Sequence, residues 1–180
     1  MADGRVVRTR RRTRKNSTGY ELTQLCMGQE GTLCIVAELV VRLTALARAE
    51  SSLQVAFERL EDCARAVRAL RRCGVAMARC ELLNRQSVES LNAVYGTILP
   101  ALATLFLQVQ GTSEGSVTET LRLAEDVVLK CGAGQLRRAH GTEDQHKMWD
   151  LRRNAYYACR ANKSHLKTAQ VRRSQCFKST

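Results

Sequence analysis

Residues 39–67, LVVRLTALARAESSLQVAFERLEDCARAV, carry the pattern that decides the predicted fold. Apolar residues return there at steps of three and four, and Glu50 is the one break. Such spacing places side chains on one face of a helix, as in a coiled-coil heptad repeat. The stretch therefore predicts a long helix with an apolar interaction seam. The seam residues are Leu39, Leu43, Leu46, Leu53, Phe57 and Leu60, and Ala64 and Val67 continue it.

The apolar pattern continues beyond this seam. A single helix over residues 33–99 would be about 100 Å long at 1.5 Å per residue, so a compact antiparallel hairpin is favoured. The chain would turn near residues 72–74 or near Asn84, and Pro100 would kink the second arm or begin a new helix. The second arm carries Val88, Leu91, Tyr95, Ile98, Leu102 and Leu105 at steps of three and four.

Two further helices are indicated by capping signals. Ser116 with Glu119, and Thr142 with Gln145, match the capping box that satisfies free backbone donors at a helix start. The first helix would end at Gly132 and Gly134. Its buried face would consist of Val117, Leu121, Ala124, Val128 and Cys131, and the second helix would carry Met148, Leu151, Ala155, Tyr156 and Cys159.

Composition agrees with an all-α fold. Aromatic residues make up 4% of the chain and there is one proline, whereas β-sandwiches and barrels need more aromatics and turn signals. We therefore predict a helical hairpin or small helical bundle. Residues 1–19 would be a disordered basic arm, residues 20–135 the helical core, and residues 136–180 a basic helical segment and tail.

The net charge of +12 is concentrated at the two ends. Residues 1–20 hold seven bases and one acid, residues 21–136 eleven bases and thirteen acids, and residues 137–180 eleven bases and three acids. Both ends could bind nucleic acid, an anionic membrane or an acidic protein, or could simply be solvated. The basic arm consists of Arg8, Arg10, Arg11, Arg12, Arg14 and Lys15, and it also has the composition of a nuclear import signal.

The chain contains eight cysteines. The N-terminus is Arg-rich and has no apolar signal-peptide core, and several cysteines fall on predicted apolar faces. We therefore expect reduced thiols and an intracellular location, with the nucleus or the cytoplasm as alternatives.

Signals for catalysis and for cofactors are weak. No nucleophile elbow, P-loop or dinucleotide fingerprint occurs, and no Cys-x-x-Cys pair suggests a metal. The longest nearly apolar run, residues 97–107, is too short to cross a membrane. The sequence thus predicts a protein that is not an enzyme and binds no cofactor or metal.

Two pairs of fragments resemble the herpesvirus egress tegument proteins of ESCRT-III-like helical fold. They are Ala45-Leu46-Ala47-Arg48 with Phe57-Glu58-Arg59-Leu60, and Thr97-Ile98-Leu99 with Ala124-Glu125-Asp126-Val127-Val128. The resemblance covers residues 40–141 and implies a helical assembly protein of viral tegument type. That family also carries a lipidated cysteine near its N-terminus, and residues 1–25 contain none.

Together these features predict a non-enzymatic protein–protein interaction or assembly subunit. Its partner would be another protein or a second copy of the chain, bound through the apolar seam. The alternative is a basic nucleic-acid-binding protein that places its two charged ends on phosphates.

Overall fold

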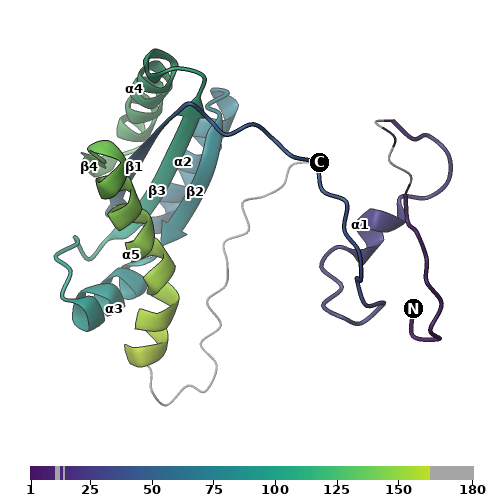
Figure 1. Ribbon diagram of the computed structural model, residues 1–180. Coiled ribbons are helices and arrows are strands. Elements are labelled where there is room, and N and C mark those ends of the chain that lie inside the picture. Colours follow the sequence, from purple (N-terminus) through teal and green to yellow (C-terminus); the bar gives the residue numbers. More distant parts are fainter. Residues whose placement is uncertain (11–12, 14, 163–180) are drawn as a thin grey trace. The chain divides into compact units, whose positions relative to one another are not determined.

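The computed structural model describes residues 1–10, 13 and 15–162 (Figure 1). The chain forms two compact units, residues 1–45 and the residues from Leu46 onward. Arg11, Arg12 and Arg14 of the predicted basic arm, and the predicted tail beyond residue 162, lie outside the described residues.

The second unit is built on a four-stranded antiparallel sheet with the order β2-β3-β1-β4. The strands alternate with helices in a β-α-β-β-α-β succession, which is the ferredoxin-like arrangement. Helix α3 is inserted between β2 and β3, and α5 follows β4 (Figure 1). The elements are β1 Ala49–Phe57, α2 Leu60–Arg72, β2 Met77–Leu83, α3 Arg85–Tyr95, β3 Ala103–Gly111, α4 Glu114–Lys130, β4 Ala133–Arg138 and α5 Gly141–Asn162.

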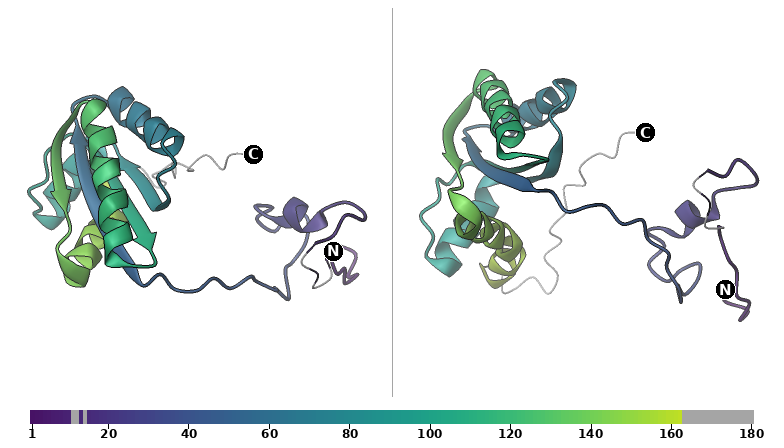
Figure 2. Two further views of the ribbon diagram at one scale, coloured as in Figure 1. Left: turned by 90° about the horizontal axis from the view of Figure 1, so that it is seen from above. Right: turned by 45° about the horizontal axis from the view of Figure 1, so that its top comes forward.

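Helices α2 and α4 cover one face of the sheet, and this interface is apolar (Figure 2). Alternate residues of β1 point into it, because successive side chains of a strand project to opposite faces. Leu53, Val55 and Phe57 are fully buried there, and they pack with the alternate residues Leu105, Leu107 and Val109 of β3.

Helices α3 and α5 cover the opposite face (Figures 1 and 2). Phe106 of β3 and Leu83 of β2 form a smaller apolar cluster there with Met148 and Trp149 of α5. Asn84 begins α3 by accepting a hydrogen bond from the Ser87 backbone amide, and Gly96 ends the helix in the left-handed conformation. The central strand β1 is therefore covered by helices on both faces.

The predicted all-α fold, including the coiled-coil hairpin, is wrong. Residues 49–57 form the strand β1, and residues 103–111, which include part of the predicted second arm, form β3. The helical pattern came from residues of different elements that happen to be three, four or seven positions apart. Within β1 the apolar residues Leu53, Val55 and Phe57 alternate with period two, and tertiary pairing decides the conformation over local helix propensity.

The two helices predicted downstream are present as α4 and α5. The α4 face predicted to be buried is buried, from Val117 to Val128. The capping box lies three residues earlier than predicted: Ser113 and Ser116 each bond the other's backbone amide. Ser116 is therefore the third helical residue and not the cap.

In the first unit the only α-helix among the described residues is α1, Leu22–Cys26. Residues 35–46 have no regular secondary structure, and most of their large apolar side chains are exposed. Across the described parts of both units, no helix is long and apolar enough to span a lipid bilayer.

Candidate functional site

Polar side chains are buried on the sheet face that α5 covers. Ser52 and Gln54 lie on β1, and Thr104 and Gln108 lie on the neighbouring strand β3. Ser52 is directly opposite Gln108 in the β1–β3 register. Gln54 lies diagonally across from Gln108. Burying polar groups costs free energy unless they are hydrogen-bonded. The hydrogen-bond partners of these side chains therefore decide how this face is stabilised.

Ser52 is the centre of a hydrogen-bond network that joins β1 to α5. The Trp149 Nε1–H donates to Ser52 Oγ at 3.0 Å, and Ser52 Oγ donates to Gln145 Oε1 at 3.1 Å. The Gln145 amide then donates to the Glu50 carbonyl oxygen at 3.2 Å. Gln145, Trp149 and Arg152 follow one another at steps of four and three, so one face of α5 presents all three to the sheet.

We expect Ser52→Ala to lower the free energy of unfolding by about 1–3 kcal/mol, because it leaves buried groups of Trp149 and Gln145 without their partner. Urea unfolding of the purified chain measures this change. Ser51→Ala is the matched control, because Ser51 is only half-buried and its side chain takes no part in this network. Equal stabilities for the two variants would contradict the network.

Arg152 carries the positive charge at this interface. Its Nη2 donates to Glu81 Oε2 of β2 at 2.7 Å, and its side chain is 19% exposed. Its Nε is buried without a hydrogen-bond partner, as are the side-chain oxygens of Gln54 and Gln108. These are the buried side-chain atoms without partners among the described residues, and all three belong to the interface between α5 and the sheet.

A second arginine lies at the same face. The Arg79 guanidinium carbon is 5.2 Å from the centroid of the Trp149 ring, a cation–π distance, and Arg79 is exposed to solvent. Arg79, Glu81 and Arg152 together carry one net positive charge. A planar guanidinium with unused donors binds carboxylates in a two-pronged geometry. The arrangement can therefore bind a small carboxylate.

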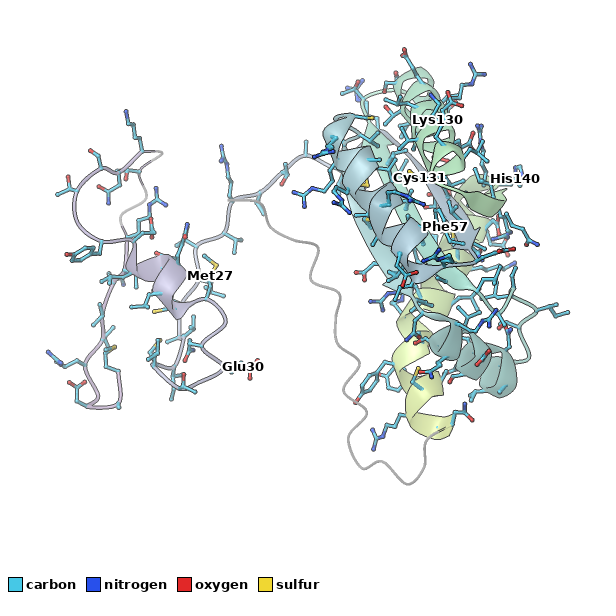
Figure 3. All side chains as sticks on the ribbon, turned by 180° about the vertical axis from the view of Figure 1, so that it is seen from behind. Met27, Glu30, Phe57, Lys130, Cys131 and His140 are labelled. Atoms are coloured by element: carbon cyan, nitrogen blue, oxygen red, sulfur yellow. The ribbon has the colours of Figure 1, made fainter. Side chains whose placement is uncertain are left out.

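A glycine-rich turn in the first unit has unusual backbone geometry. Gly28, Glu30 and Gly31 all have positive φ, at 77°, 48° and 83°. Figure 3 labels Glu30 in this turn. A Cβ atom added at Gly28 or Gly31 would meet nothing within 4 Å, so the backbone is bare on that side. A residue with a side chain, such as Glu30, adopts this conformation at some cost, and such residues are concentrated at ligand-binding sites.

The seam residues of the sequence prediction do not lie on one surface. Leu39 and Leu43 are exposed in the first unit, and Leu46 begins the second unit 94% exposed. Leu53 and Phe57 are buried in β1, while Leu60 is the half-exposed first residue of α2.

In the basic arm, Arg8 pairs with Glu38 at 3.5 Å and Arg10 pairs with Glu21 at 3.3 Å. Lys15 is exposed. Binding of a polyanion by this arm stays a prediction. Among the residues that the structure describes, no group of three or more His, Cys, Asp or Glu side chains is placed to hold a metal ion.

Sequence reasoning missed the polar sheet face altogether. Ser52 and Gln54 alternate with Leu53 and Val55, and a period-two interpretation of residues 51–57 would have placed these polar side chains together on one face. Arg152 follows the chain's one tryptophan by three residues, which places both on one helix face.

The fold and these contacts define an α/β domain with a polar, arginine-bearing sheet face beneath α5. The chain belongs to the family described as FAD linked oxidases, C-terminal domain, whose sequence profile matches residues 46–171. The predicted resemblance to herpesvirus tegument proteins is therefore wrong. It relied on helix-forming residues at 45–48, 57–60, 97–99 and 124–128; residues 45–48 and 97–99 lie outside any helix, and Phe57 is the last residue of the strand β1.

The chain is similar in sequence to several oxidoreductases. It is 29% identical over 161 residues to the mitochondrial D-lactate dehydrogenase [cytochrome] of Arabidopsis thaliana, covering 89% of this chain and 28% of that protein. It is 29% identical over 175 residues to D-lactate dehydrogenase [cytochrome] 1, mitochondrial, of Saccharomyces cerevisiae, covering 95% and 30%. It is 28% identical over 160 residues to the glycolate oxidase subunit GlcD of Bacillus subtilis, covering 88% and 34%.

A solved structure shares the fold. The structure of alkyldihydroxyacetonephosphate synthase matches with a TM-score of 0.57 at 18% identity, over 80% of this chain and 29% of that one. The chain thus spans about a third or less of the length of these proteins.

Family membership also corrects the predicted function. A non-enzymatic assembly subunit, or its nucleic-acid-binding alternative, is wrong, because the family is a domain of FAD-linked oxidases, which are oxidoreductases. The names of several relatives place them in mitochondria. An intracellular location fits these relatives, whereas the nucleus receives no support from them.

Proposed function

We propose that this chain is the substrate-binding part of an FAD-linked oxidoreductase that oxidises a small 2-hydroxy acid such as D-lactate or glycolate. The observation that carries the proposal is Arg152, an arginine held against a polar sheet face with a buried donor left unpaired. The family and the names of its relatives supply the reaction class. Since the chain spans only part of those relatives, activity belongs to the whole protein that contains it.

Arg152 is well suited to take the substrate's carboxylate. Glu81 binds one of its terminal nitrogens at 2.7 Å and so fixes the plane of the guanidinium. Its Nε–H is buried and has no hydrogen-bond partner among the described residues. Charge-assisted hydrogen bonds of this kind are about twice as strong as neutral ones, and they orient a planar carboxylate. A fixed carboxylate presents the adjacent hydroxyl-bearing carbon in one direction, which is what a stereospecific oxidation needs.

The side-chain amides of Gln54 and Gln108 would complete this site. Each has a buried side-chain oxygen without a hydrogen-bond donor, and each lies on the sheet face that α5 covers. A substrate hydroxyl is a donor that could satisfy one of these oxygens. The same pair would disfavour a ligand without a hydroxyl, because its binding would leave the oxygens unpaired.

In this proposal the glycine-rich turn of the first unit, at Gly28 and Gly31, is the segment that would hold a phosphate group of FAD. Its glycines leave the backbone open to close approach, and successive backbone amides in such turns bind phosphate groups. Bound FAD supplies the two-electron acceptor for oxidation of a hydroxy acid to an oxo acid.

The exposed apolar residues Leu39, Leu43 and Leu46 then have a proposed partner. We propose that they pack against another part of the oxidoreductase, in the same polypeptide or in a partner chain. An extended segment with exposed Leu and Val side chains needs such cover. We also propose the mitochondrion as the location, in keeping with the names of the relatives.

The proposal is tested with the native protein, isolated from its source through a tag on this chain together with whatever it is joined to or bound by. We expect it to purify with FAD and to reduce an artificial electron acceptor when D-lactate or glycolate is added. L-lactate tests stereospecificity, and propionate, which lacks the hydroxyl, is the negative control. A protein that binds no flavin and oxidises no 2-hydroxy acid would overturn the proposed function.

A further inference from the structure

Cys26 and Cys34 form a pair of thiols in the first unit. The Cys34 Sγ–H donates to Cys26 Sγ at a sulfur–sulfur distance of 3.8 Å, and both residues are partly exposed. Cys26 is the last residue of α1, and Cys34 follows the glycine-rich turn. Seven residues separate the two, so the thiols meet at the base of that turn.

Gln29 holds Cys34 in this position. Its side-chain oxygen accepts from the backbone amides of Leu33 at 2.9 Å and Cys34 at 3.3 Å. Its side-chain nitrogen donates to the Cys34 carbonyl oxygen at 3.0 Å. One side chain thus bonds both polar backbone groups of Cys34 from inside the turn. The approach of the two sulfurs is therefore built into the local structure rather than left to free motion of the loop.

We propose that Cys26 and Cys34 are a redox-sensitive pair that forms a disulfide when the protein meets a peroxide. One of the two thiolates attacks one peroxide oxygen, the O–O bond breaks, and a sulfenic acid and hydroxide form. The other thiolate then attacks the sulfenic sulfur, the S–O bond breaks, and hydroxide leaves and is protonated to water. In total, two thiols are oxidised, hydrogen peroxide is reduced, and two water molecules form.

The two thiols have complementary roles in this reaction. The hydrogen bond with Cys34 raises the pKa of Cys26 above its usual value. A thiolate is the attacking species, and the neighbouring cysteine, whose sulfur lies 3.8 Å away, resolves the intermediate. The new bond would close the turn that contains Gly28 and Gly31. This inference does not depend on the function proposed for the chain.

Peptide mapping of the full chain tests the proposal directly. Residues 16–41 contain no Lys or Arg. Trypsin therefore leaves both cysteines on one peptide, residues 16–42. After brief treatment with hydrogen peroxide, we expect this peptide to lose two hydrogen atoms and to take up no iodoacetamide. Dithiothreitol should restore both alkylation sites.

Two other cysteines serve as internal controls. Cys73 is exposed and reports the peroxide dose, while burial raises the pKa of Cys63 to about 12, so Cys63 should stay unreacted in the folded chain. In Cys34→Ser the same peptide should keep one alkylatable thiol after reduction and form no internal disulfide. If peroxide oxidises Cys73 while both cysteines of peptide 16–42 stay alkylatable, the proposal is overturned.

A second measurement needs no variant. Amide hydrogen exchange in residues 27–33 of the wild-type chain should slow at least several-fold after oxidation and should recover on reduction. A closed loop loses the open states from which its amides exchange. A disulfide that forms without slowing exchange would show that the bond does not constrain the turn, and that part of the proposal would then fail.

Discussion

Leu53→Asp should unfold the second unit. Leu53 is fully buried in the central strand β1 and packs between the sheet and the helices α2 and α4. Even Leu53→Ala should cost about 2–5 kcal/mol, because it removes a large buried side chain from a close-packed core. An unpaired carboxylate there costs more, against a total stability of about 5–15 kcal/mol for a domain of this size. Circular dichroism during thermal unfolding measures the loss.

Leu46→Asp is the matched control, because it makes the same chemical change at a position of the same predicted helical seam. Leu46 is 94% exposed, so the melting temperature should move little. A helical seam would make both substitutions similarly harmful. A folded Leu53→Asp variant with the stability of the parent would contradict the placement of β1 in the core.

Arg152→Leu should abolish carboxylate binding at the polar sheet face. Loss of one member of a buried, hydrogen-bonded charge pair typically costs 2–5 kcal/mol, which means an affinity at least about 30-fold weaker. Trp149 is the only tryptophan of the chain and lies on the same face, with its ring beneath Arg79. Its fluorescence therefore reports binding when D-lactate is titrated into the purified chain. Lactamide, which has no charge, should give no response.

Arg153→Leu is the control for the loss of an arginine as such. Arg153 is the next residue along α5, is exposed, and pairs with Asp150 of its own helix. It should leave D-lactate binding unchanged. If both variants bind D-lactate as the parent does, Arg152 is not the carboxylate-binding residue. Arg152→Lys separates charge from geometry, because lysine keeps the charge but lacks the planar donor fork.

The sequence alone predicts the helices of this fold better than its strands. Helix α4 has a buried face at regular spacing and a serine-rich start, and both signals are local. The strand β1 has period-two alternation over only a few residues, and its conformation depends on pairing with β3 and β4, which are distant in the chain. Leucine and alanine are also strong helix formers, so propensity favoured the wrong conformation until the sheet decided it.

The candidate site was harder to predict for a related reason. Its members come from β1, β2, β3 and α5, so no motif of fixed spacing contains them. Arg152 and Glu81 are 71 positions apart and meet only because α5 returns to the sheet after β4. Gln54 and Gln108 become informative only once both are buried without partners. Such a site follows from topology, and here the topology was predicted wrongly.

The order of the sheet also limits how it can grow. β1 and β3 are each paired on both sides, so additional strands can join only beside β2 or β4. The β4 edge is six residues long and carries Arg137 and Arg138, which point to opposite faces, with Arg138 bonded to Glu125 of α4. Short, charged edges discourage pairing between separate molecules. A strand added from within the same protein would not be repelled by the charge of the β4 edge if it brought acidic residues alongside Arg137. The register between β1 and β3 would stay the same.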